Sequence, residues 1–283
     1  MTAAGRFVRV DGVPLHVVVE GRGPVVVLST GLAMAWFDWD RVAAPLVAAG
    51  RTVVRFDRPG HGLSGPAAVA PSAAGEARRI AGLLDALGPP GRVGVAGHSL
   101  AGFHAEAFAR LYPERTAGVV LVDASVEETP GALLPAGLRT GAARALGRAL
   151  TAAGLPAALG PAARRLAVRA SRAGGGDPAA RDLVRRCYRT GRVWRGALLE
   201  NSRYPDMAAE VAALRRTHPL PAAAPLTVLA GYDGSTRGPA LRWLARQAAL
   251  ADLLGARFEV AAPAGHLVML DRPDQVARAV QRA

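Results

Sequence analysis

The chain of 283 residues contains no lysine, one cysteine and few aromatic residues, which make up 5% of it. With Cys187 alone, the chain cannot form an internal disulfide, and we expect a cytoplasmic protein. No Cys/His cluster has the spacing of metal ligands, so we expect no metal site. No uncharged apolar run reaches the roughly 18 residues of a membrane helix, and we expect neither membrane association nor a signal peptide.

Because lysine is absent, arginine supplies all 35 basic side chains, and the formal net charge is +13. Residues 130–205 hold fourteen arginines against three carboxylates and so carry +11 of that charge. The charge alone would suit a nucleic acid, but no aromatic interleaving or nucleic-acid motif accompanies it, so we expect no nucleic-acid partner. The segment is either a solvated surface or a basic lid that attracts an anionic or carrier-bound substrate or an acidic partner protein.

The first 126 residues alternate short apolar runs with helical patterns. Continuous apolar runs at 25–29, 52–56, 93–96 and 119–122 are typical of buried strands, and the residues between them show helical spacing. Asp11-Gly12 is a hairpin signal between two further strands near the N-terminus. This rhythm predicts an α/β fold with a mostly parallel sheet, helices on both faces and antiparallel strands at one edge.

The pattern changes over residues 127–218, which are rich in Ala, Arg, Leu, Gly and Pro and contain no convincing strand. Helical spacing continues there, and prolines such as Pro161 and Pro205 are expected to divide it into short helices. The sheet pattern resumes at 226–230. We therefore predict a core of residues 1–126 and 219–283 with a helical lid of residues 127–218 inserted into it.

The hexapeptide Gly97-His98-Ser99-Leu100-Ala101-Gly102 stands between an apolar run and a helical pattern. A serine flanked by small residues on a strand-to-helix corner has the layout of a nucleophile elbow, with its hydroxyl at a helix N-terminus. The usual G-x-S-x-G pattern is altered at one place, since alanine stands where the second glycine is usual. The alternative is a structural turn in which Ser99 only caps the helix.

A serine nucleophile needs a base and an acid that orients the base. His266 follows the last predicted strand, after the small residues Ala264 and Gly265, and is the candidate base. Asp233 follows the strand at 226–230 and is the first candidate for the acid, with Asp123, at the end of the preceding strand, as the alternative. For the oxyanion hole we expect the backbone N–H groups of Leu100 and of Leu32, whose neighbour is Ala33.

These residues together resemble the α/β-hydrolase superfamily over nearly the whole chain. The elbow at 97–102, the turn Asp57-Arg58-Pro59-Gly60-His61-Gly62-Leu63-Ser64 and the C-terminal Gly265-His266 stand in the order of that family's motifs. Thr30-Gly31 replaces the usual His-Gly before the oxyanion loop, so the hydrogen bond that supports this loop must differ. The resemblance implies a helical lid over the site. Its members that open epoxides or displace halide use an aspartate nucleophile, where this chain has serine.

The sequence therefore predicts a lidded serine hydrolase that cleaves a carboxylic ester or a related acyl bond without a cofactor. Lactone, thioester, amide, carbon–carbon and perhydrolase chemistry remain open, because one fold hosts many reactions. Two alternatives belong to other classes: a protein that binds a ligand without catalysis, and a lyase that uses the same serine and histidine. Substrate identity and oligomeric state are not predicted.

Overall fold

The computed structural model of this chain describes residues 5–88, 91–127 and 131–283. The strands are β1 (Arg6–Val10), β2 (Val13–Glu20), β3 (Val25–Ser29), β4 (Thr52–Phe56), β5 (Val93–His98), β6 (Thr116–Val122), β7 (Leu226–Gly231) and β8 (Arg257–Ala261). The helices are α1 (Asp40–Ala48), α2 (Ala73–Leu87), α3 (Ala101–Leu111), α4 (Ala136–Ala152), α5 (Leu155–Ala170), α6 (Arg181–Tyr188), α7 (Gly191–Thr217), α8 (Gly238–Leu254), α9 (Val268–Asp271) and α10 (Pro273–Arg282). Two 3₁₀ turns occupy Trp36–Trp39 and Pro113–Arg115.

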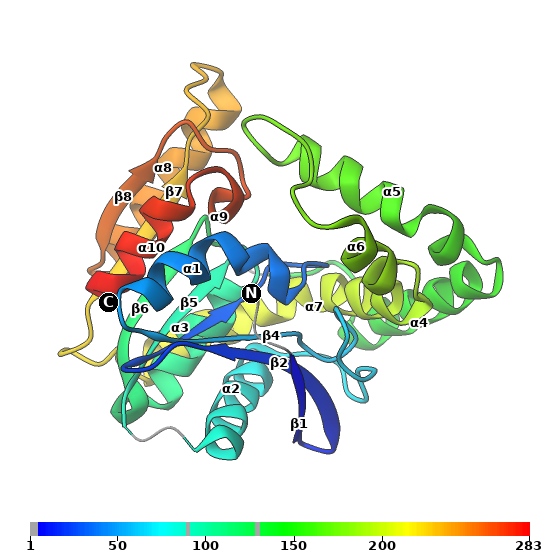
Figure 1. The fold of residues 1–283 in the computed structure, drawn as a ribbon, viewed down its shortest axis with the longest axis horizontal. Coiled ribbons are helices and arrows are strands. Elements are labelled where there is room, and N and C mark those ends of the chain that lie inside the picture. Colours follow the sequence, from blue (N-terminus) through cyan, green and yellow to red (C-terminus); the bar gives the residue numbers. More distant parts are fainter. Residues whose placement is uncertain (1–4, 89–90, 128–130) are drawn as a thin grey trace.

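The strands form one sheet in the order β1-β2-β4-β3-β5-β6-β7-β8 (Figure 1). β1, β2 and β4 pair antiparallel, and every later neighbour pair is parallel. This confirms the predicted mostly parallel sheet with antiparallel strands at one edge. Because the parallel strands share one direction, their carboxyl ends meet at the same side of the sheet, where sites in such folds form.

The predicted hairpin turn joins β1 to β2 through Asp11 and Gly12. Val10 pairs with Val13, so the loop has two residues, and their φ angles are +48° and +77°. Two consecutive positive φ angles define a type I′ turn, whose twist matches that of the flanking strands. Glycine and aspartate tolerate this backbone conformation, which explains why the pair was a reliable signal.

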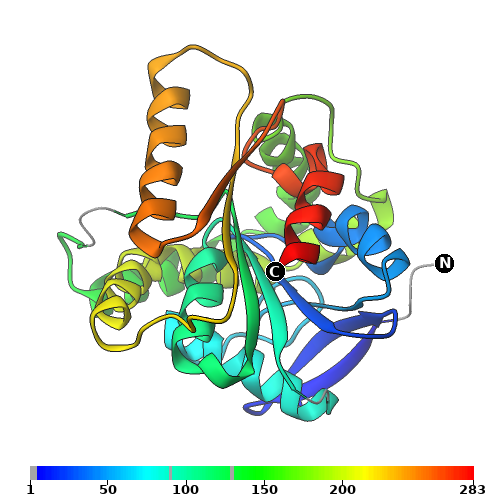
Figure 2. The same ribbon diagram turned by 90° about the vertical axis from the view of Figure 1, so that its left-hand side faces the viewer.

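Helices cover both faces of the sheet (Figure 2). On one face, apolar residues of α2, α3 and α8 pack against the strands, around fully buried side chains such as Leu83 and Phe108. On the other face, α1, α9 and α10 pack around Leu46 and Val276. The central strand β5 is buried along its whole length, and the sheet therefore gives the residues that follow it a rigid base.

Helices α4–α7 form the predicted helical insertion between β6 and β7, called the cap below (Figure 1). The limits at residues 127 and 218 stay a prediction, and residues 128–130, beside the first limit, lie outside the described part. In the described ranges, no helix is long and apolar enough to cross a membrane.

The prediction that prolines divide the insertion into short helices is wrong at Pro161 and Pro205, which lie inside α5 and α7. Proline removes one helical hydrogen bond and crowds the carbonyl of the preceding turn. Arg139 of α4 braces α7 around Pro205, because its guanidinium donates to the carbonyl of Ser202 and to both carboxylate oxygens of Asp206, at 2.7 and 2.8 Å. α7 nevertheless continues over 27 residues, and this tertiary contact beside Pro205 is invisible in the local sequence.

The cap rests on the core through a small apolar cluster of its own. Trp36 and Phe37 of the core pack there with Val184, Cys187 and Tyr188 of α6. The lone cysteine is fully buried, and this burial raises the pKa of its thiol to about 12. Cys187 is thus a packing residue whose thiol stays protonated, so it offers no nucleophile.

Candidate active site

Ser99 occupies the sharp turn between β5 and α3 with a backbone φ of +53°, a left-handed conformation that residues with side chains rarely adopt. A Cβ atom at Gly97 would lie 2.2 Å from the carbonyl oxygen of Ala101, and one at Gly102 would lie 2.6 Å from the Cβ of Ala124. The turn therefore requires glycine at positions 97 and 102. Ala101 is accommodated, fully buried, where the usual pattern has glycine.

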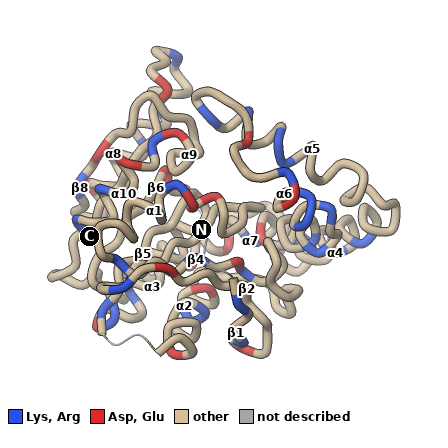
Figure 3. The backbone as a smooth tube through the Cα atoms, in the orientation of Figure 1, with Lys and Arg blue, Asp and Glu red and all other residues tan. Residues whose placement is uncertain are grey.

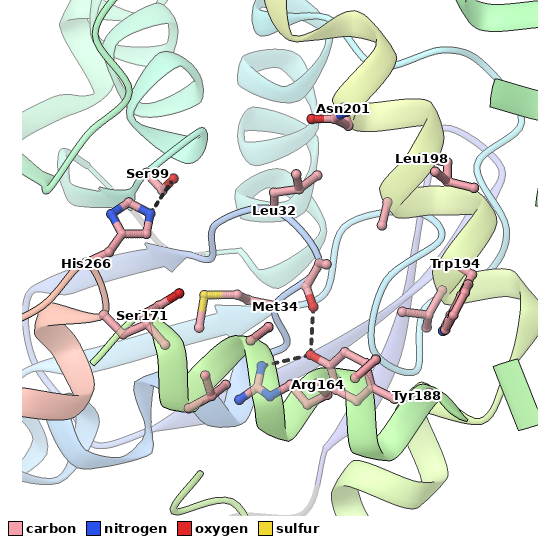
Figure 4. A pocket seen from close by; sticks show the side chains of 18 of the residues that line it. Leu32, Met34, Ser99, Arg164, Ser171, Tyr188, Trp194, Leu198, Asn201 and His266 are labelled. Atoms are coloured by element: carbon pink, nitrogen blue, oxygen red, sulfur yellow. Dashed lines mark hydrogen bonds between the residues drawn. The ribbon is translucent and has the colours of Figure 1, made fainter. Parts of the chain in front are cut away.

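His266 lies in the loop after β8 and turns its imidazole toward the elbow (Figure 4). Its Nε2 atom is 3.0 Å from the hydroxyl oxygen of Ser99. A Cβ atom at Gly265 would lie 2.5 Å from the carbonyl oxygen of Ser171, so glycine is needed where this loop passes the end of α5. The sequence-predicted nucleophile and base are thus within proton-transfer distance.

Asp123 completes a line of three side chains. Its Oδ2 atom is 2.6 Å from Nδ1 of His266, and its Oδ1 atom accepts hydrogen bonds from the backbone N–H of Gly231 and the indole N–H of Trp243, both at 2.9 Å. The carboxylate is buried and has donors on both oxygens. A well-anchored carboxylate on Nδ1 sets the tautomer that leaves Nε2 free to accept a proton.

The first-choice acid, Asp233, is not in contact with His266, and the alternative, Asp123, takes its place. Asp233 lies two residues beyond the end of β7, and its Oδ1 accepts the backbone N–H of Ser235 at 2.8 Å. It serves a local turn instead. β6 and β7 are neighbours and end at the same side of the sheet, so both acids were plausible from position. Asp123 directly follows β6, the strand beside the nucleophile strand β5, and is therefore nearer the elbow.

His98, which precedes the nucleophile, holds the backbone of the base His266. Its Nε2 donates to the carbonyl oxygen of His266 at 2.9 Å, and the two rings lie 4.7 Å apart. Burial and the neighbouring His266 hold the pKa of His98 well below its ordinary value, so this imidazole stays neutral. A neutral ring with its one proton on Nε2 holds the His266 backbone without adding charge beside the base.

The two predicted oxyanion donors are both available. In the described part of the chain, neither the N–H of Leu100 nor that of Leu32 donates to any protein acceptor. The loop that carries Leu32 passes directly over the elbow, since a Cβ atom at Gly31 would lie 3.2 Å from the Cβ of Ser99. Leu100 follows Ser99 at the start of α3, where backbone N–H groups are free of helical partners.

A cavity of about 640 Å³ opens beside Ser99, between the core and the cap (Figure 4). Aliphatic side chains from the oxyanion loop, α5 and α7 dominate its lining, among them Leu32, Met34, Val168 and Leu198. Such a lining favours apolar ligand groups held close to the reacting atoms.

One cation, Arg164 of α5, lines the cavity, and its charge is already compensated. Its guanidinium binds both carboxylate oxygens of Asp38 and lies 3.1 Å from Asp177. Burial alone would lower the pKa of Arg164, but the contact with Asp38 raises it well above the ordinary value. The pair is a buried structural link between cap and core, and the cavity offers no unpaired positive charge among its lining residues.

Residues 25–279 match the alpha/beta hydrolase family. The chain belongs to this family. The resemblance inferred from the motifs is thereby confirmed.

Two curated relatives of this alpha/beta hydrolase show the range of chemistry around it. One, from Dechloromonas aromatica (strain RCB), is named 2-hydroxy-6-oxononadienedioate/2-hydroxy-6-oxononatrienedioate hydrolase 1 and is 38% identical over 40% of this chain and 36% of its own length. Another, epoxide hydrolase B of Mycobacterium tuberculosis (strain ATCC 25618 / H37Rv), is 33% identical over 42% of this chain and 35% of its own. The matches span little more than a third of each relative.

The solved structure of a thermophilic esterase from Thermogutta terrifontis superposes with a TM-score of 0.71, covering 99% of this chain and 97% of that one. At 23% sequence identity this similarity establishes a shared fold. The fold alone leaves the reaction open, because relatives with different activities share it.

Sequence reasoning missed several residues around the site. The sequence pattern gave His98 no role, although its place next to the nucleophile was a usable signal. Arg164 and Tyr188 left no signal, because their partners Asp38 and Ala33 are distant in the chain. Contacts between cap and core depend on how the insertion folds back, and this is not encoded in local spacing.

Proposed function

We propose that this alpha/beta hydrolase is a serine hydrolase that cleaves a carboxylic ester through an acyl-enzyme intermediate on Ser99. One observation carries the proposal: the hydrogen-bonded line from the Ser99 hydroxyl through His266 to Asp123, set at the edge of an apolar cavity. This is the arrangement that activates a serine hydroxyl for attack on a carbonyl carbon.

In the first half-reaction, Nε2 of His266 removes the hydroxyl proton of Ser99 as the serine oxygen bonds to the ester carbonyl carbon. The carbonyl oxygen becomes an oxyanion that accepts hydrogen bonds from the N–H groups of Leu32 and Leu100. His266, held by Asp123, then gives its proton to the departing alkoxide. The carbon–oxygen bond to the leaving group breaks, an alcohol leaves, and the acyl group stays on Ser99.

In the second half-reaction, His266 removes a proton from a water molecule, whose oxygen bonds to the acyl carbon. The same two N–H groups stabilise the new oxyanion. When the intermediate collapses, the serine oxygen takes the proton back from His266 and the carboxylic acid is released. The chain's own side chains supply every proton transfer in this scheme.

The substrate that fits best is uncharged and largely apolar. The arginines suggested an anionic or carrier-bound substrate. Figure 3 shows many of them along α4, α5 and α6, where most are exposed to solvent, and only Arg164 lines the cavity. The cavity itself contains one guanidinium, Arg164, which two carboxylates already occupy. The Dechloromonas aromatica relative is named for a dioate, a doubly charged compound. Among the described residues that line this cavity, no cation is unpaired and able to bind such a charge. We therefore favour an uncharged ester over a dioate as the substrate.

The nucleophile separates this proposal from epoxide opening. The family resemblance implies an aspartate nucleophile for epoxide hydrolases, and this elbow carries Ser99. A non-catalytic binding role predicts no activated serine, and the following experiment distinguishes it from acyl transfer. A lyase that uses the same serine and histidine predicts no acyl-enzyme and therefore no turnover of an ester.

A fluorophosphonate probe should label the wild-type protein once, as read by intact mass, because only an activated serine displaces its fluoride. The adduct should be absent from Ser99→Ala. Ser171→Ala is the matched control, since this second hydroxyl lines the same cavity but, in the described part of the chain, makes no hydrogen bond to a histidine, and labelling should persist. A folded wild-type protein that takes up no probe would overturn the proposal in favour of ligand binding.

The charge preference has its own measurement. We expect kcat/KM for 4-nitrophenyl butyrate to exceed that for the mono-4-nitrophenyl ester of glutaric acid, which carries a carboxylate, by at least about tenfold, because burying an uncompensated charge is costly. The ratio should persist at high salt, since it arises inside the cavity. A preference for the anionic ester that disappears with added salt would instead support attraction by the basic cap surface.

A further inference from the structure

Arg58, in the turn after β4, holds the loop that carries the oxyanion donor Leu32. Its guanidinium is buried and donates to the carbonyl oxygen and hydroxyl of Thr30 and, at 3.0 Å, to the carbonyl oxygen of Gly31. Where Thr30-Gly31 replaces the usual His-Gly, N–H donors of Arg58 therefore support the loop.

The remaining donors of Arg58 bind a residue of the cap. Glu200, on α7, accepts the Nε–H at 2.7 Å and an NH2 proton at 2.9 Å, which is a bidentate pair. Nε2 of His61 lies 3.3 Å from the same carboxylate. A guanidinium has five N–H donors, and three acceptors on the loop and two on Glu200 match all of them.

The contact of Arg58 with Gly31 fixes the peptide unit that carries the oxyanion donor, the N–H of Leu32. The carbonyl of Gly31 and the N–H of Leu32 belong to one planar trans peptide, so they point in opposite directions. Fixing the carbonyl toward Arg58 therefore fixes the direction of the Leu32 N–H. The positive guanidinium also polarises this peptide, which makes the N–H a stronger donor toward a developing oxyanion.

Both charges of the pair are maintained in the interior. Burial alone would raise the pKa of Glu200, yet Arg58 and His61 hold it below its ordinary value, so the carboxylate stays ionised. Burial alone would lower the pKa of Arg58, but Glu200 raises it above the ordinary value. Each side chain is only 2% exposed, so loss of one partner leaves a buried charge that must find new contacts.

A second cap residue holds the other side of the same loop. The hydroxyl of Tyr188 donates to the carbonyl oxygen of Ala33 at 2.7 Å and accepts from Arg164 at 3.0 Å (Figure 4). Ala33 has a φ of +58°, a backbone conformation that needs support from its surroundings. The Gly31–Leu32 peptide thus lies between the carbonyl of Thr30, which Arg58 holds, and the carbonyl of Ala33, which Tyr188 holds. Glu200 of the cap binds Arg58, and Tyr188 belongs to the cap itself.

From these contacts we infer that Glu200 is a positioning residue of the cap: acting through Arg58, it orients the Gly31–Leu32 peptide, so that the oxyanion hole is complete only with the cap seated on the core. This inference rests on the proposed serine hydrolase function. Glu200 takes no part in bond making, and its effect appears only where negative charge develops on the substrate oxygen.

The test compares Glu200→Gln with Asp206→Asn, a cap carboxylate on the same helix that pairs with Arg139 away from the cavity. For 4-nitrophenyl butyrate, kcat of Glu200→Gln should fall on the order of 10²-fold, the lower range for loss of one oxyanion donor, while KM changes less than about threefold. Asp206→Asn should match the wild type in both parameters.

A reversible inhibitor supplies the second readout. An alkyl trifluoromethyl ketone adds the Ser99 hydroxyl and places an oxyanion where the tetrahedral intermediate has one. Its inhibition constant should rise in Glu200→Gln by the same factor by which kcat falls, and stay constant in Asp206→Asn. A role limited to stability would lower the melting temperature and leave both quantities in the folded fraction unchanged.

Arg58→Lys gives the same measurements if Glu200→Gln does not fold, because lysine keeps the charge but lacks the fork that reaches both loop carbonyls. Unchanged kcat, or a loss of kcat without weaker ketone binding, would overturn the inference. These results are separable from failure of the proposed function, which would appear as a wild-type protein without a Ser99 adduct.

Discussion

Ser99→Ala and His266→Ala should each lower kcat for an uncharged ester about 10⁶-fold, as in dissected catalytic triads. Without the serine oxygen no acyl-enzyme forms, and without the Nε2 atom that lies 3.0 Å away nothing accepts the serine proton. What remains comes from substrate binding and the two backbone N–H donors acting on a water attack.

The double variant sharpens this result. Because Ser99 and His266 act as one unit, Ser99→Ala/His266→Ala should be no slower than either single variant, whereas independent contributions would multiply. His218→Ala is the control, since the ring of this exposed histidine at the end of the cap hydrogen-bonds only with Thr217 in the described part of the chain and should be dispensable for kcat. Initial rates with 4-nitrophenyl butyrate, corrected for the uncatalysed reaction, measure the effect. A loss smaller than about 10²-fold would mean that another group performs the attack.

The elbow was predictable because its determinants are local. Gly97, Ser99 and Gly102 lie within six residues, and the close approach that requires Gly97 occurs with Ala101 of the same turn. The hairpin at Asp11-Gly12 follows from an equally short-range signal. Where a residue's conformation is decided by its chain neighbours, sequence pattern and structure agree.

The acid was ambiguous because its role is decided at long range. Asp123 and Asp233 both follow parallel strands, and nothing in either local sequence says which carboxylate meets a histidine that is 143 residues from the first. Trp243 of α8 and the N–H of Gly231 hold Asp123 in place, and their partnership exists only after α8 has packed on the sheet.

The oxyanion support shows the same limit more strongly. Thr30 in place of histidine indicated that the hydrogen bond supporting the loop differs. The hydrogen bonds that take its place join three distant segments: the loop at Gly31, the turn at Arg58 and the cap at Glu200. Sequence patterns do not identify a buried arginine or a buried glutamate, because a charge is buried only beside a partner, and here the partner is distant in the chain.

Asp123→Asn should lower kcat about 10⁴-fold, while Asp233→Asn should stay within about twofold of the wild type. An asparagine at 123 still accepts the N–H groups of Gly231 and Trp243 through its oxygen, so the fold around it is retained. Its amide, however, donates toward Nδ1 of His266. That stabilises the tautomer with the proton on Nε2, which cannot accept the serine proton.

The same pair of variants decides which acid acts. In Asp123→Asn, the rate of fluorophosphonate labelling and kcat should fall together. In Asp233→Asn, neither should fall, because the Asp233 carboxylate only accepts the N–H of Ser235 in an exposed turn. Deamidation would regenerate aspartate, and about 0.01% of it would account for a 10⁴-fold residual, so kcat must be equal in fresh and aged preparations of the variant. Asp123→Ala is the weaker experiment, because it leaves two buried donors unpaired and mixes lost stability with lost chemistry. A fall in Asp233→Asn alone would mean that the turn at 231–235 rearranges when substrate binds and brings Asp233 to His266.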